Sequence, residues 1–596
     1  MTADAYLGVA RSLRGRAWRE RPAAPEVSRE LTRLHGLSEP VARVLAARGI
    51  ALGMAEAFLQ PKLRTWFPDP SSFAGMDEAA SVLVDALERE RPITVFADYD
   101  VDGASSAAQV VRWLRHMGQE ATIHVPDRLT DGFGPSPAAM RRLHENGAEL
   151  VVTVDCGAAA DAALAEADDL GLDVVVIDHH LMRAAPAGRA VVVNPNRPDC
   201  GSGQGHLSAS GVTFVLLAAL NREARRREMF VARREPDLAC WLDLAALGAI
   251  CDVTQLTGFN RALTAQGLKR MSDWRNPGLA ALMDVAGAAR GPASPHHAGF
   301  ILGPRINAGG RIGRSDLGAR LLSTDDPAEA AALAAELDAL NAGRRELERR
   351  ITDEAVHMIE HGANFDPDAP VIVASGEEWH PGVIGIVAGR LRERYRKPVI
   401  IIAVDRQADI GRGSGRSQPG VNLGLAVQAG FDEGLLLSGG GHAMAAGLAL
   451  RPAAIPEFRA FLVERLESEA EAARGADALE IDALVSPEAA GRALHDEFRR
   501  LEPFGPGNPE PVLALADVRT ERAGVVRGGH VRCELVGAGG RRLKAIAWRS
   551  EDSEFGRRLL MGGALHVAGR LTADDWRGRR DVQFEIEDAA DPRRTL

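Results

Sequence analysis

Residues 93–103 read ITVFADYDVDG, an apolar run that ends in three carboxylates, and this stretch decides the fold class. Three further runs end in a similar way: LVVTVDCG at 150–157, VVVIDHH at 174–180 and LDLAALGAICDV at 242–253. We interpret each run as a short buried β-strand whose carboxyl end carries an acid or an imidazole. Helical patterns between the runs predict βαβ units and a parallel sheet. In open α/β sheets, ligands bind at the edge formed by these strand ends.

The pattern along the chain predicts an α/β protein of several domains. In the first domain we expect strands at 93–97, 121–125, 151–154 and 174–177, and helices at 81–90, 105–117, 137–146 and 158–170. In the second domain we expect strands at 371–374 and 399–403, helices at 382–394 and 421–429, and a further helix that opens at the GGGH segment, 439–442. The expected parts are a helical N-terminal segment (1–75), a catalytic α/β domain (76–265), a helical region with a long connecting helix over 326–362 (266–362), a second α/β domain (363–455), a linker helix (456–477) and a small C-terminal β-barrel (478–596).

Composition is that of an ordinary globular protein, with 596 residues, 46% hydrophobic and 26% charged. Five scattered cysteines without a CxxC pair argue against a disulfide framework or a zinc ribbon and favour a reducing cytoplasm. We expect no membrane span and no signal segment. The net charge is −11, but residues 518–596 hold 16 Lys and Arg against 12 Asp and Glu. Global charge therefore does not exclude nucleic acid as a partner.

The acidic clusters admit an ordinary structural explanation as well as a functional one. Asp98, Asp100 and Asp102 could form a solvated turn that caps a helix, and Asp155 and Asp252 could each be a capping residue. Three carboxylates so close repel one another unless cations lie between them. Hard oxygen ligands with one or two imidazoles suit Mg²⁺ or Mn²⁺ better than Zn²⁺. All four motifs together favour a site for two metal ions.

Several segments carry a resemblance to a known family. The four acidic motifs, among them Asp178-His179-His180, resemble those of the DHH phosphoesterase superfamily, and GGGHAMAAG at 439–447 is similar to the signature of its companion DHHA1 domain. Four further segments narrow the resemblance to the exonucleases of this superfamily: LGPRINAGGR (302–311), WHPGVIG (379–385), RGSGRS (412–417) and PFGPGNPEP (503–511). It extends from residue 40 or so to the C-terminus and implies a single-strand-specific 5′→3′ DNA exonuclease. Gly309 in place of Ala and DGFG at 131–134 in place of EGYG are mild departures.

The resemblance also implies a set of catalytic residues. The ligands of two Mn²⁺ or Mg²⁺ ions would be Asp100, Asp102, Asp155, His179 and Asp252, with Asp155 as the bridge between the ions. Asp98, Asp178 and His180 would orient those ligands or the scissile phosphate. No protein nucleophile is needed in such a site.

Substrate binding is expected mainly from the second α/β domain. The candidate residues are Arg128, Arg305, Arg311, His380, Arg390, Arg412, Ser414, Arg416, Gly440, Gly441 and His442. Ser414 and Arg416, together with Arg128, suit a 5′-phosphate pocket, because guanidinium groups, hydroxyls and exposed N–H groups bind phosphate. The glycines could instead form only a tight turn, or they could let the backbone approach a phosphate at a helix N-terminus, with His442 facing the substrate.

The C-terminal barrel resembles an OB-fold. Trp548 and Trp576 lie beside arginines and could stack on bases, although one of them could simply be a core residue. The expected partner is single-stranded DNA, and the family resemblance adds a helicase and a single-strand-binding protein. The protein is expected to be a cytoplasmic monomer.

Two other functions are open. The first is a DHH phosphodiesterase for short oligonucleotides, cyclic dinucleotides or pyrophosphate, which would not need a C-terminal barrel. The second is a non-catalytic scaffold, which the intact ligand positions argue against.

Overall fold

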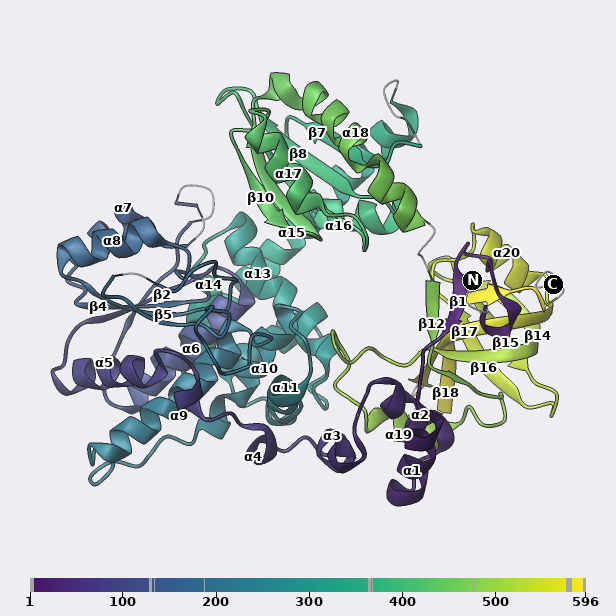
Figure 1. Ribbon diagram of the computed structural model, residues 1–596, viewed down its shortest axis with the longest axis horizontal. Helices are drawn as coiled ribbons and strands as arrows, with labels where there is room; N and C mark the ends of the chain where they lie inside the picture. Colours follow the sequence, from purple (N-terminus) through teal and green to yellow (C-terminus); the bar gives the residue numbers. More distant parts are fainter. Residues whose placement is uncertain are drawn as a thin grey trace. The chain divides into compact units, whose positions relative to one another are not determined.

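The computed structural model shows two compact units, which we describe separately (Figure 1). One unit comprises Pro68–Asp252 and Gly267–Ala476, and the other comprises Met1–Phe67, Val253–Gln266 and Asp477–Leu596. The residues that the structure describes are 5–127, 131–132, 134–186, 188–362, 366, 368–474, 478–574 and 581–592.

A parallel sheet forms the centre of the first α/β domain. Its strand order is β3 (Thr122–His124), β2 (Ile93–Ala97), β4 (Leu150–Val154), β5 (Asp173–Ile177), β6 (Val191–Val193). Helices α7 (Pro137–Glu145) and α8 (Asp161–Leu170) pack against one face, while α5 (Met76–Glu88), α6 (Val101–His116) and α9 (Ala209–Arg226) lie on the other (Figure 1). The predicted strands and parallel sheet are therefore confirmed.

The register of this sheet brings the polar strand ends into line. Ala97 pairs with Val154, Val154 with Ile177, and Ile177 with Val193. The residues directly after these strand ends therefore lie next to one another along the carboxyl edge, as the sequence predicts. They are Asp98, Asp155, Asp178 and Asn194.

The fourth apolar run is a helix, and the prediction of a strand there was wrong. Residues Leu242–Cys251 form α10, and Asp252 comes next as its C-cap. The run is rich in Leu and Ala, which favour helix, and it has no β-branched residue before Ile250. Because α10 is buried nearly all round, its sequence lacks the alternation that would mark a helix with one exposed face.

A long helix links the two α/β domains, as predicted. Helix α15 (Pro327–His361) has 35 residues and is about 50 Å long. Its first half packs on α12 (Pro277–Val285), α13 (Gly303–Ile312) and α14 (Leu317–Ser323). Its second half places Ile351, Ala355 and Ile359 in the core of the second domain. One rigid element therefore contributes to both cores.

The second α/β domain has a mixed sheet. Its strand order is β10 (Ser438–His442), β11 (Ala445–Leu450), β9 (Ile410–Arg416), β8 (Val399–Asp405), β7 (Ile372–Gly376). The same domain contains three helices, α16 (Ile384–Tyr395), α17 (Leu423–Asp432) and α18 (Ile455–Arg474). The expectation that GGGH opens a helix was wrong, since these residues form β10 in a hairpin with β11. Glycine is a poor helix former, and it permits the close packing of this hairpin.

Helix α18 covers the part of the chain that we expected to be a linker. Its Phe458, Leu462 and Leu466 are buried in the same core as Ile400 and Val427 of the second α/β domain. Most of the expected linker therefore packs as part of this domain.

The C-terminal residues form the predicted barrel. The strand order is β13 (Ala483–Leu484), β14 (Leu513–Val526), β15 (His530–Val536), β16 (Arg542–Ala547), β18 (Asp581–Ala590), β17 (Gly563–Asp574). An additional pairing between β14 and β17 closes the barrel. Helices α19 (Arg492–Arg499) and α20 (Glu554–Leu560) pack on its core.

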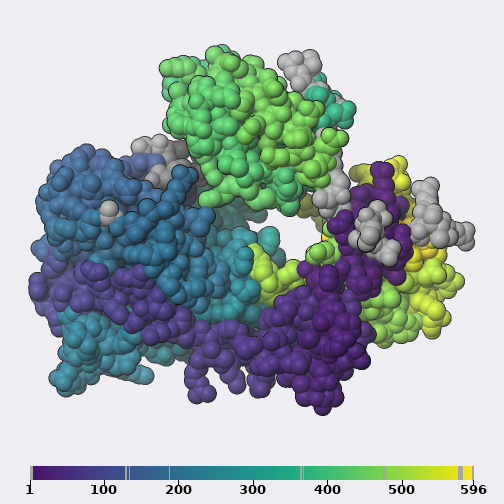
Figure 2. Space-filling model, viewed as in Figure 1, coloured from purple at the N-terminus to yellow at the C-terminus, as the bar shows by residue number. Residues whose placement is uncertain are grey.

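The N-terminal segment belongs to the barrel unit as far as Phe67 and is not wholly helical. Helices α1 (Pro25–His35), α2 (Glu39–Ala47), α3 (Ala55–Leu59) and α4 (Leu63–Trp66) come after strand β1 (Ala17–Glu20), which pairs with β12 (Ala478–Ile481). Trp18 is fully buried and donates from Nε1 to Asp588 Oδ2 at 3.3 Å. Ser12 and Arg16 also donate to this carboxylate. In Figure 2 the purple N-terminal residues lie against yellow residues of the barrel.

Within the described ranges, no helix is long and apolar enough to cross a membrane. All five cysteines lie in described segments, and each is free.

Candidate metal centre and substrate pocket

The loop between β2 and α6 carries the first acidic motif in a tight turn. Asp100 caps α6, and its Oδ1 accepts hydrogen bonds from the N–H groups of Asp102 at 2.8 Å and Gly103 at 3.2 Å. A side chain at Gly103 would collide with the carbonyl of Asp98. Glycine thus allows the turn that brings three carboxylates together.

Asp102 belongs to α6, and its carboxylate lies against the N-terminus of α9. Its side chain is buried and accepts hydrogen bonds from the N–H groups of Ala209 at 2.6 Å and Ser210 at 3.0 Å. Burial is the main cause that raises the pKa of Asp102, while His179 opposes the rise and Asp100 adds to it. Free N–H groups at a helix N-terminus stabilise an anion, so α9 both orients this carboxylate and favours its charge.

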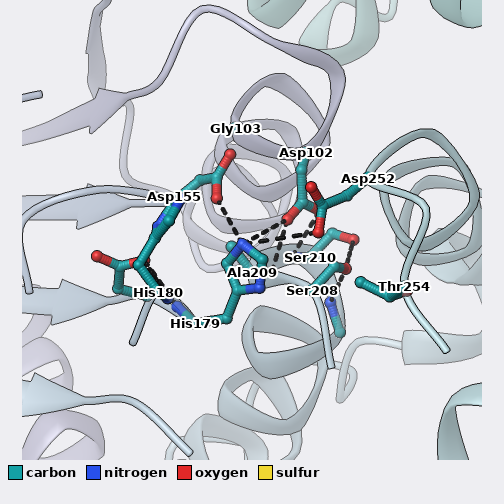
Figure 3. A network of polar contacts seen from close by, with 12 residues as sticks. Asp102, Gly103, Asp155, His179, His180, Ser208, Ala209, Ser210, Asp252 and Thr254 are labelled. Atoms are coloured by element: carbon teal, nitrogen blue, oxygen red, sulfur yellow. Dashed lines mark hydrogen bonds and ion pairs between the residues drawn. The ribbon is translucent and has the colours of Figure 1, made fainter. Parts of the chain in front are cut away.

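One imidazole nitrogen lies where carboxylates from three elements meet (Figure 3). His179 Nε2 is 3.2 Å from Asp155 Oδ1, 3.7 Å from Asp252 Oδ2 and 3.9 Å from Asp102 Oδ2. Asp155 has a left-handed backbone, with φ of 61°, and its N–H donates to the carbonyl of Ile177. The structure therefore brings together residues that come after β4, β5 and α10 with one in α6.

The donor atoms form overlapping groups that fit metal ions. In each group the donors lie within 4.8 Å of one another, and the groups are Asp98, Asp100 and Asp155; Asp102, His179 and Asp252; and Asp155, His179 and His180. Oxygen donors with imidazole are the ligands expected for Mn²⁺ or Mg²⁺. Asp155 and His179 each belong to two groups, and of these two the carboxylate of Asp155 has the two oxygens that a bridging ligand needs.

Crowding of negative charge gives independent support to this fit. Burial, followed by the charges of Asp100, Asp102 and Asp98, raises the pKa of Asp155 well above its usual range. Burial and the charges of Asp102 and Asp100 raise the pKa of Asp252 to about 8. A divalent cation between these carboxylates would remove the repulsion that adds to the effect of burial on both pKa values.

Asp178 and His180 form a pair beside the cluster. Asp178 is buried and accepts hydrogen bonds from the N–H groups of Ala158 at 2.9 Å and His179 at 2.7 Å, and its Oδ1 lies 2.7 Å from His180 Nδ1. Burial alone would raise the pKa of Asp178, but these hydrogen bonds outweigh it and lower the pKa to about 2. The hydrogen bond to Asp178 raises the pKa of His180 to about 9, against the effect of burial. Asp178 therefore fixes the backbone of both histidines.

Three asparagines contribute to the site without having been predicted. Asn194 donates from Nδ2 to the carbonyl of His180 at 2.8 Å, and Asn196 donates to that of His179 at 2.6 Å. Asn307 accepts a hydrogen bond from the N–H of Val101 at 3.1 Å. Asn194 comes directly after the apolar run 191–193, so the pattern used for the acidic motifs could have found it. Asn307 lies in the LGPRINAGGR segment that carries the family resemblance, but no local pattern indicates its contact, which joins distant segments.

A second site lies on strand β9. Glycines at 411, 413 and 415 face the core, where a side chain at Gly413 would come within 2.6 Å of Leu448 Cδ1. Arg412, Ser414 and Arg416 alternate with these glycines and line an open pocket of about 670 Å³. Arg416 donates from Nη1 to Ser414 Oγ at 3.3 Å. A strand with this alternation thus presents two guanidinium groups and a hydroxyl on one face.

Of the other predicted substrate-binding residues, Arg311 and His380 lie near the Ser414 pocket, whereas Arg305 and Arg390 form ion pairs within the fold. Arg311 donates to the carbonyl of Gly382 at 3.1 Å, and His380 accepts from the N–H of Gly382 at 3.0 Å. Arg305 pairs with Asp338 at 2.8 Å, and Arg390 pairs with the buried Glu348, both on α15. These two ion pairs hold helices together, which the sequence pattern did not indicate.

Three more predicted residues lie in the β10–β11 hairpin. Gly440, Gly441 and His442 belong to β10, but the described lining of the Ser414 pocket includes Ser438 of that strand instead. A side chain at Gly441 would collide with the carbonyl of Ala445, so glycine permits the close backbone packing of this hairpin. Phosphate binding was argued from a helix N-terminus at these residues, and that argument fails because the segment is a strand.

Trp548 comes directly after strand β16 of the barrel and is 49% exposed. It contacts the ring of His530 edge-on, with centroids 4.8 Å apart. It is therefore a surface residue and not part of the core. Arg128 and Trp576 lie outside the described residues.

The PFGPGNPEP segment has a structural role in the barrel unit. Buried Arg261 donates to the carbonyls of Pro503 at 3.2 Å and Phe58 at 3.3 Å, and its guanidinium lies 4.0 Å from the Phe58 ring centroid. Asn508 donates to the carbonyls of Leu501 and Pro503. Burial lowers the pKa of Arg261 to about 9. The segment thus joins the N-terminal helices to residues 253–266.

Comparison with known proteins agrees with this architecture. Family models match in three places: the DHH family N-terminal domain at 92–249, the DHHA1 domain at 368–468 and the RecJ OB domain at 481–588. The single-stranded-DNA-specific exonuclease RecJ of Dickeya dadantii is 37% identical over 524 residues, which is 86% of this chain and 90% of that protein. The protein of the same name from Bacillus subtilis is 33% identical over 96% of this chain and 70% of its own length.

Solved structures show the same relationship. The crystal structure of RecJ from Thermus thermophilus in complex with Mn²⁺ is similar with a TM-score of 0.78 and 32% identity, over 96% of this chain and 79% of that one. The Mg²⁺ complex of the same protein gives a TM-score of 0.72. The matched domains, their order and the extent of these similarities show that this chain belongs to the RecJ family.

Proposed function

We propose that this protein hydrolyses single-stranded DNA from the 5′ end and releases 5′-mononucleotides. The observation that carries the proposal is the convergence of Asp102, Asp155 and Asp252 on His179, in a chain whose relatives are named single-stranded-DNA-specific exonucleases. The known Mn²⁺ and Mg²⁺ complexes of the Thermus thermophilus relative support the choice of cation.

The cluster would hold two divalent ions. Asp98, Asp100 and Asp155 are placed for one ion, and Asp102, His179 and Asp252 for the other. Asp155 Oδ1 lies 3.2 Å from His179 Nε2 of the second group. This assignment adds Asp98, which we expected only to orient ligands, to the ligand set. Divalent ions held there would supply a nucleophile from water at neutral pH and would stabilise the attacking and leaving oxygens.

The protein's own part is to keep these ligands in position. The α9 N-terminus holds Asp102, and Asp178 holds the backbone of both histidines. His180 has a side chain that is 56% exposed, so it is available to contact the scissile phosphate. Hydrogen-bonded ligands keep their geometry when a substrate arrives, which lowers the cost of reorganisation.

The Ser414 pocket supports the direction of degradation. Two guanidinium groups and a hydroxyl suit a terminal phosphate, which carries more charge than an internal phosphodiester. A strand anchored there by its 5′ end would place an inner phosphodiester at the metal centre. Arg311 is bonded to Gly382, close to Pro381 in the pocket lining, and would add positive charge between the two sites.

The barrel supplies a separate surface for single-stranded DNA. Trp548 and His530 are aromatic groups at that surface, and Arg549 comes directly after Trp548. Stacking on such groups tolerates any base sequence. A phosphodiesterase for small substrates has no use for this surface, so we favour the exonuclease. We further propose a cytoplasmic monomer that works with a helicase and a single-strand-binding protein, which rests on the family resemblance alone.

Digestion of end-labelled DNA tests the proposal. Single strands and blunt duplexes carrying a 5′ or 3′ label would be incubated with Mn²⁺, Mg²⁺ or EDTA. We expect early release of the 5′ label as a mononucleotide from single strands, with either cation but not with EDTA. Early loss of the 3′ label, or equal rates on blunt duplex, would overturn the proposal.

A further inference from the structure

A buried ion network lies in the middle of α15. Glu348 is 1% exposed, and each of its carboxylate oxygens faces one arginine: Oε2 is 2.9 Å from Arg344 Nη1, and Oε1 is 2.5 Å from Arg390 Nε. Arg344 precedes Glu348 by one turn and donates to Asn341 Oδ1 from Nε at 3.2 Å and from Nη2 at 2.9 Å. Arg390 belongs to α16, so the network joins the connecting helix to that helix of the second α/β domain.

The network is better suited to fixing a position than to adding stability. Removing charges from water costs free energy, so a buried ion pair is often no more stable than apolar side chains of similar size. The apolar core around the two helices, which includes Ile351 of α15 and Leu391 of α16, is held by non-directional contacts that tolerate a small shift. A carboxylate with one oxygen for each guanidinium does not tolerate such a shift. Glu348 therefore defines where α16 lies on α15.

The first turn of α16 lies against the proposed 5′-phosphate pocket. A Cβ atom at Gly385 would be 2.9 Å from Ser414 Oγ and 3.3 Å from Arg416 Nη2. Ile384 is itself part of the pocket lining. Arg390 lies five residues beyond Gly385 in the same helix, which is about 7.5 Å along its axis. Because a helix of this length moves as one body, a shift at Arg390 would move the wall of the pocket.

The first half of α15 is tied in a similar way to the helix beside the metal centre. Arg305 Nε of α13 is 2.8 Å from Asp338 Oδ1 of α15. Asn307 of α13 accepts a hydrogen bond from the N–H of Val101 in the acidic loop. Asp338 and Glu348 are ten residues apart on α15, which is about 15 Å along the axis. One rigid helix therefore spaces the element beside the metal centre from the element beside the pocket.

We infer that Glu348 is a positioning residue that, through Arg390, sets the distance between the 5′-phosphate pocket and the metal centre. The inference rests on the proposed function and deepens it. Once the terminal phosphate is anchored, that distance decides which phosphodiester reaches the metal ligands. In the native protein it selects the first one, so the product is a mononucleotide. A pocket that shifts with α16 would also admit the second phosphodiester and would hold the terminal phosphate less well.

The test compares Glu348→Gln with Glu346→Gln, a matched control on the same helix. Glu346 is exposed and pairs with Arg349 at 2.6 Å, so both variants remove one carboxylate from α15 but only Glu348→Gln changes the network. Single strands with a 5′-phosphate or a 5′-hydroxyl would be digested with Mn²⁺, and the first products would be separated by length. We expect mononucleotides from the native protein and from Glu346→Gln, and a mixture of mononucleotides and dinucleotides from Glu348→Gln.

Kinetics give a second measurement. The ratio of kcat/KM for 5′-phosphorylated strands to that for 5′-hydroxyl strands should fall by about tenfold or more in Glu348→Gln, as expected for the loss of one charge-assisted contact to the phosphate. The Kd for Mn²⁺ and the turnover of a dinucleotide without a 5′-phosphate should not change. A general loss of structure would change all of these quantities together.

Arg390→Leu removes the same contact from its other side. The Arg390 side chain is 59% exposed, and its loss leaves Glu348 paired with Arg344. This variant should also release dinucleotides, and adding Glu348→Gln to it should change the products no further, since both substitutions remove one interaction. Additive effects would show that Arg390 acts on the strand independently of Glu348 and would overturn the inference. If Glu348→Gln does not fold, the products of Arg390→Leu decide the question.

The outcomes separate the inference from the function on which it rests. A folded Glu348→Gln protein that releases only mononucleotides, with the native preference for a 5′-phosphate, would overturn the positioning role alone. An equal loss on 5′-phosphorylated strands, 5′-hydroxyl strands and dinucleotides would also overturn it, because it would show a general defect of the site. A native protein that leaves every single strand intact would overturn the proposed function.

Discussion

Replacing Gly248 by alanine tests how the metal centre is held. Gly248 lies in α10, where a Cβ atom would collide with Ser210 Oγ and with Asp102 Oδ1. The same helix ends at Asp252, one turn later. The added methyl group must therefore displace a carboxylate or shift the helix that carries a second one. Extra methyl groups in packed cores cost about 1–3 kcal/mol.

If the strain is relieved by moving Asp102, the cost appears in metal binding. A loss of 1–3 kcal/mol corresponds to a rise of about 5- to 150-fold in the Kd for Mn²⁺. Isothermal titration would measure this Kd, and thermal unfolding would show how much of the strain destabilises the fold instead. The retained affinity for a long single strand would show that the barrel is intact.

The matched control is Gly389→Ala in α16. Gly389 is also helical, but a Cβ atom there meets nothing within 4 Å. Alanine at this position should stabilise the protein by about 0.5–1 kcal/mol and leave the Kd unchanged. If Gly248→Ala bound Mn²⁺ as the native protein does and unfolded at the same temperature, our reasoning about the α9–α10 frame would be refuted.

Three further predictions address other parts of the molecule. Asp155→Ala should reduce hydrolysis by about 10³-fold or more with strand binding largely retained, and activity within about tenfold of native would contradict a bridging role. Arg416→Ala should weaken the use of 5′-phosphorylated strands by about 1.5–3 kcal/mol, measured as kcat/KM against 5′-hydroxyl strands, and an equal loss on both would mark Arg416 as a general contact. Asp588→Ala should destabilise the barrel unit by about 1–3 kcal/mol in denaturant unfolding, because the buried donors of Ser12 and Trp18 lose their acceptor while Arg16 keeps Glu587. A change below about 1 kcal/mol would mean that water replaces the carboxylate.

Much of the metal centre could be predicted because its residues come directly after the strands. The runs before Asp98, Asp155 and Asp178 are short, apolar and rich in Val and Ile, which favour strands. A parallel sheet then brings their ends to one edge by its register, whatever the rest of the chain does. Asp252 and the Ser414 segment also stood out in the sequence, but their assignment to a site rested mainly on the family resemblance.

Only the tertiary structure decided how the remaining residues take part. The run before Asp252 is a helix, because a short apolar run does not reveal whether its burial is that of a strand or of a helix. The GGGH segment is a strand because it pairs with residues that come after it. Arg305 and Arg390 meet carboxylates 33 and 42 residues away in the sequence, on α15. Local sequence sets the preference of each segment for helix or strand. Strand pairing, burial and ion-pair partners depend instead on segments that are distant in the chain. These long-range contacts determine which polar side chains remain available to a substrate.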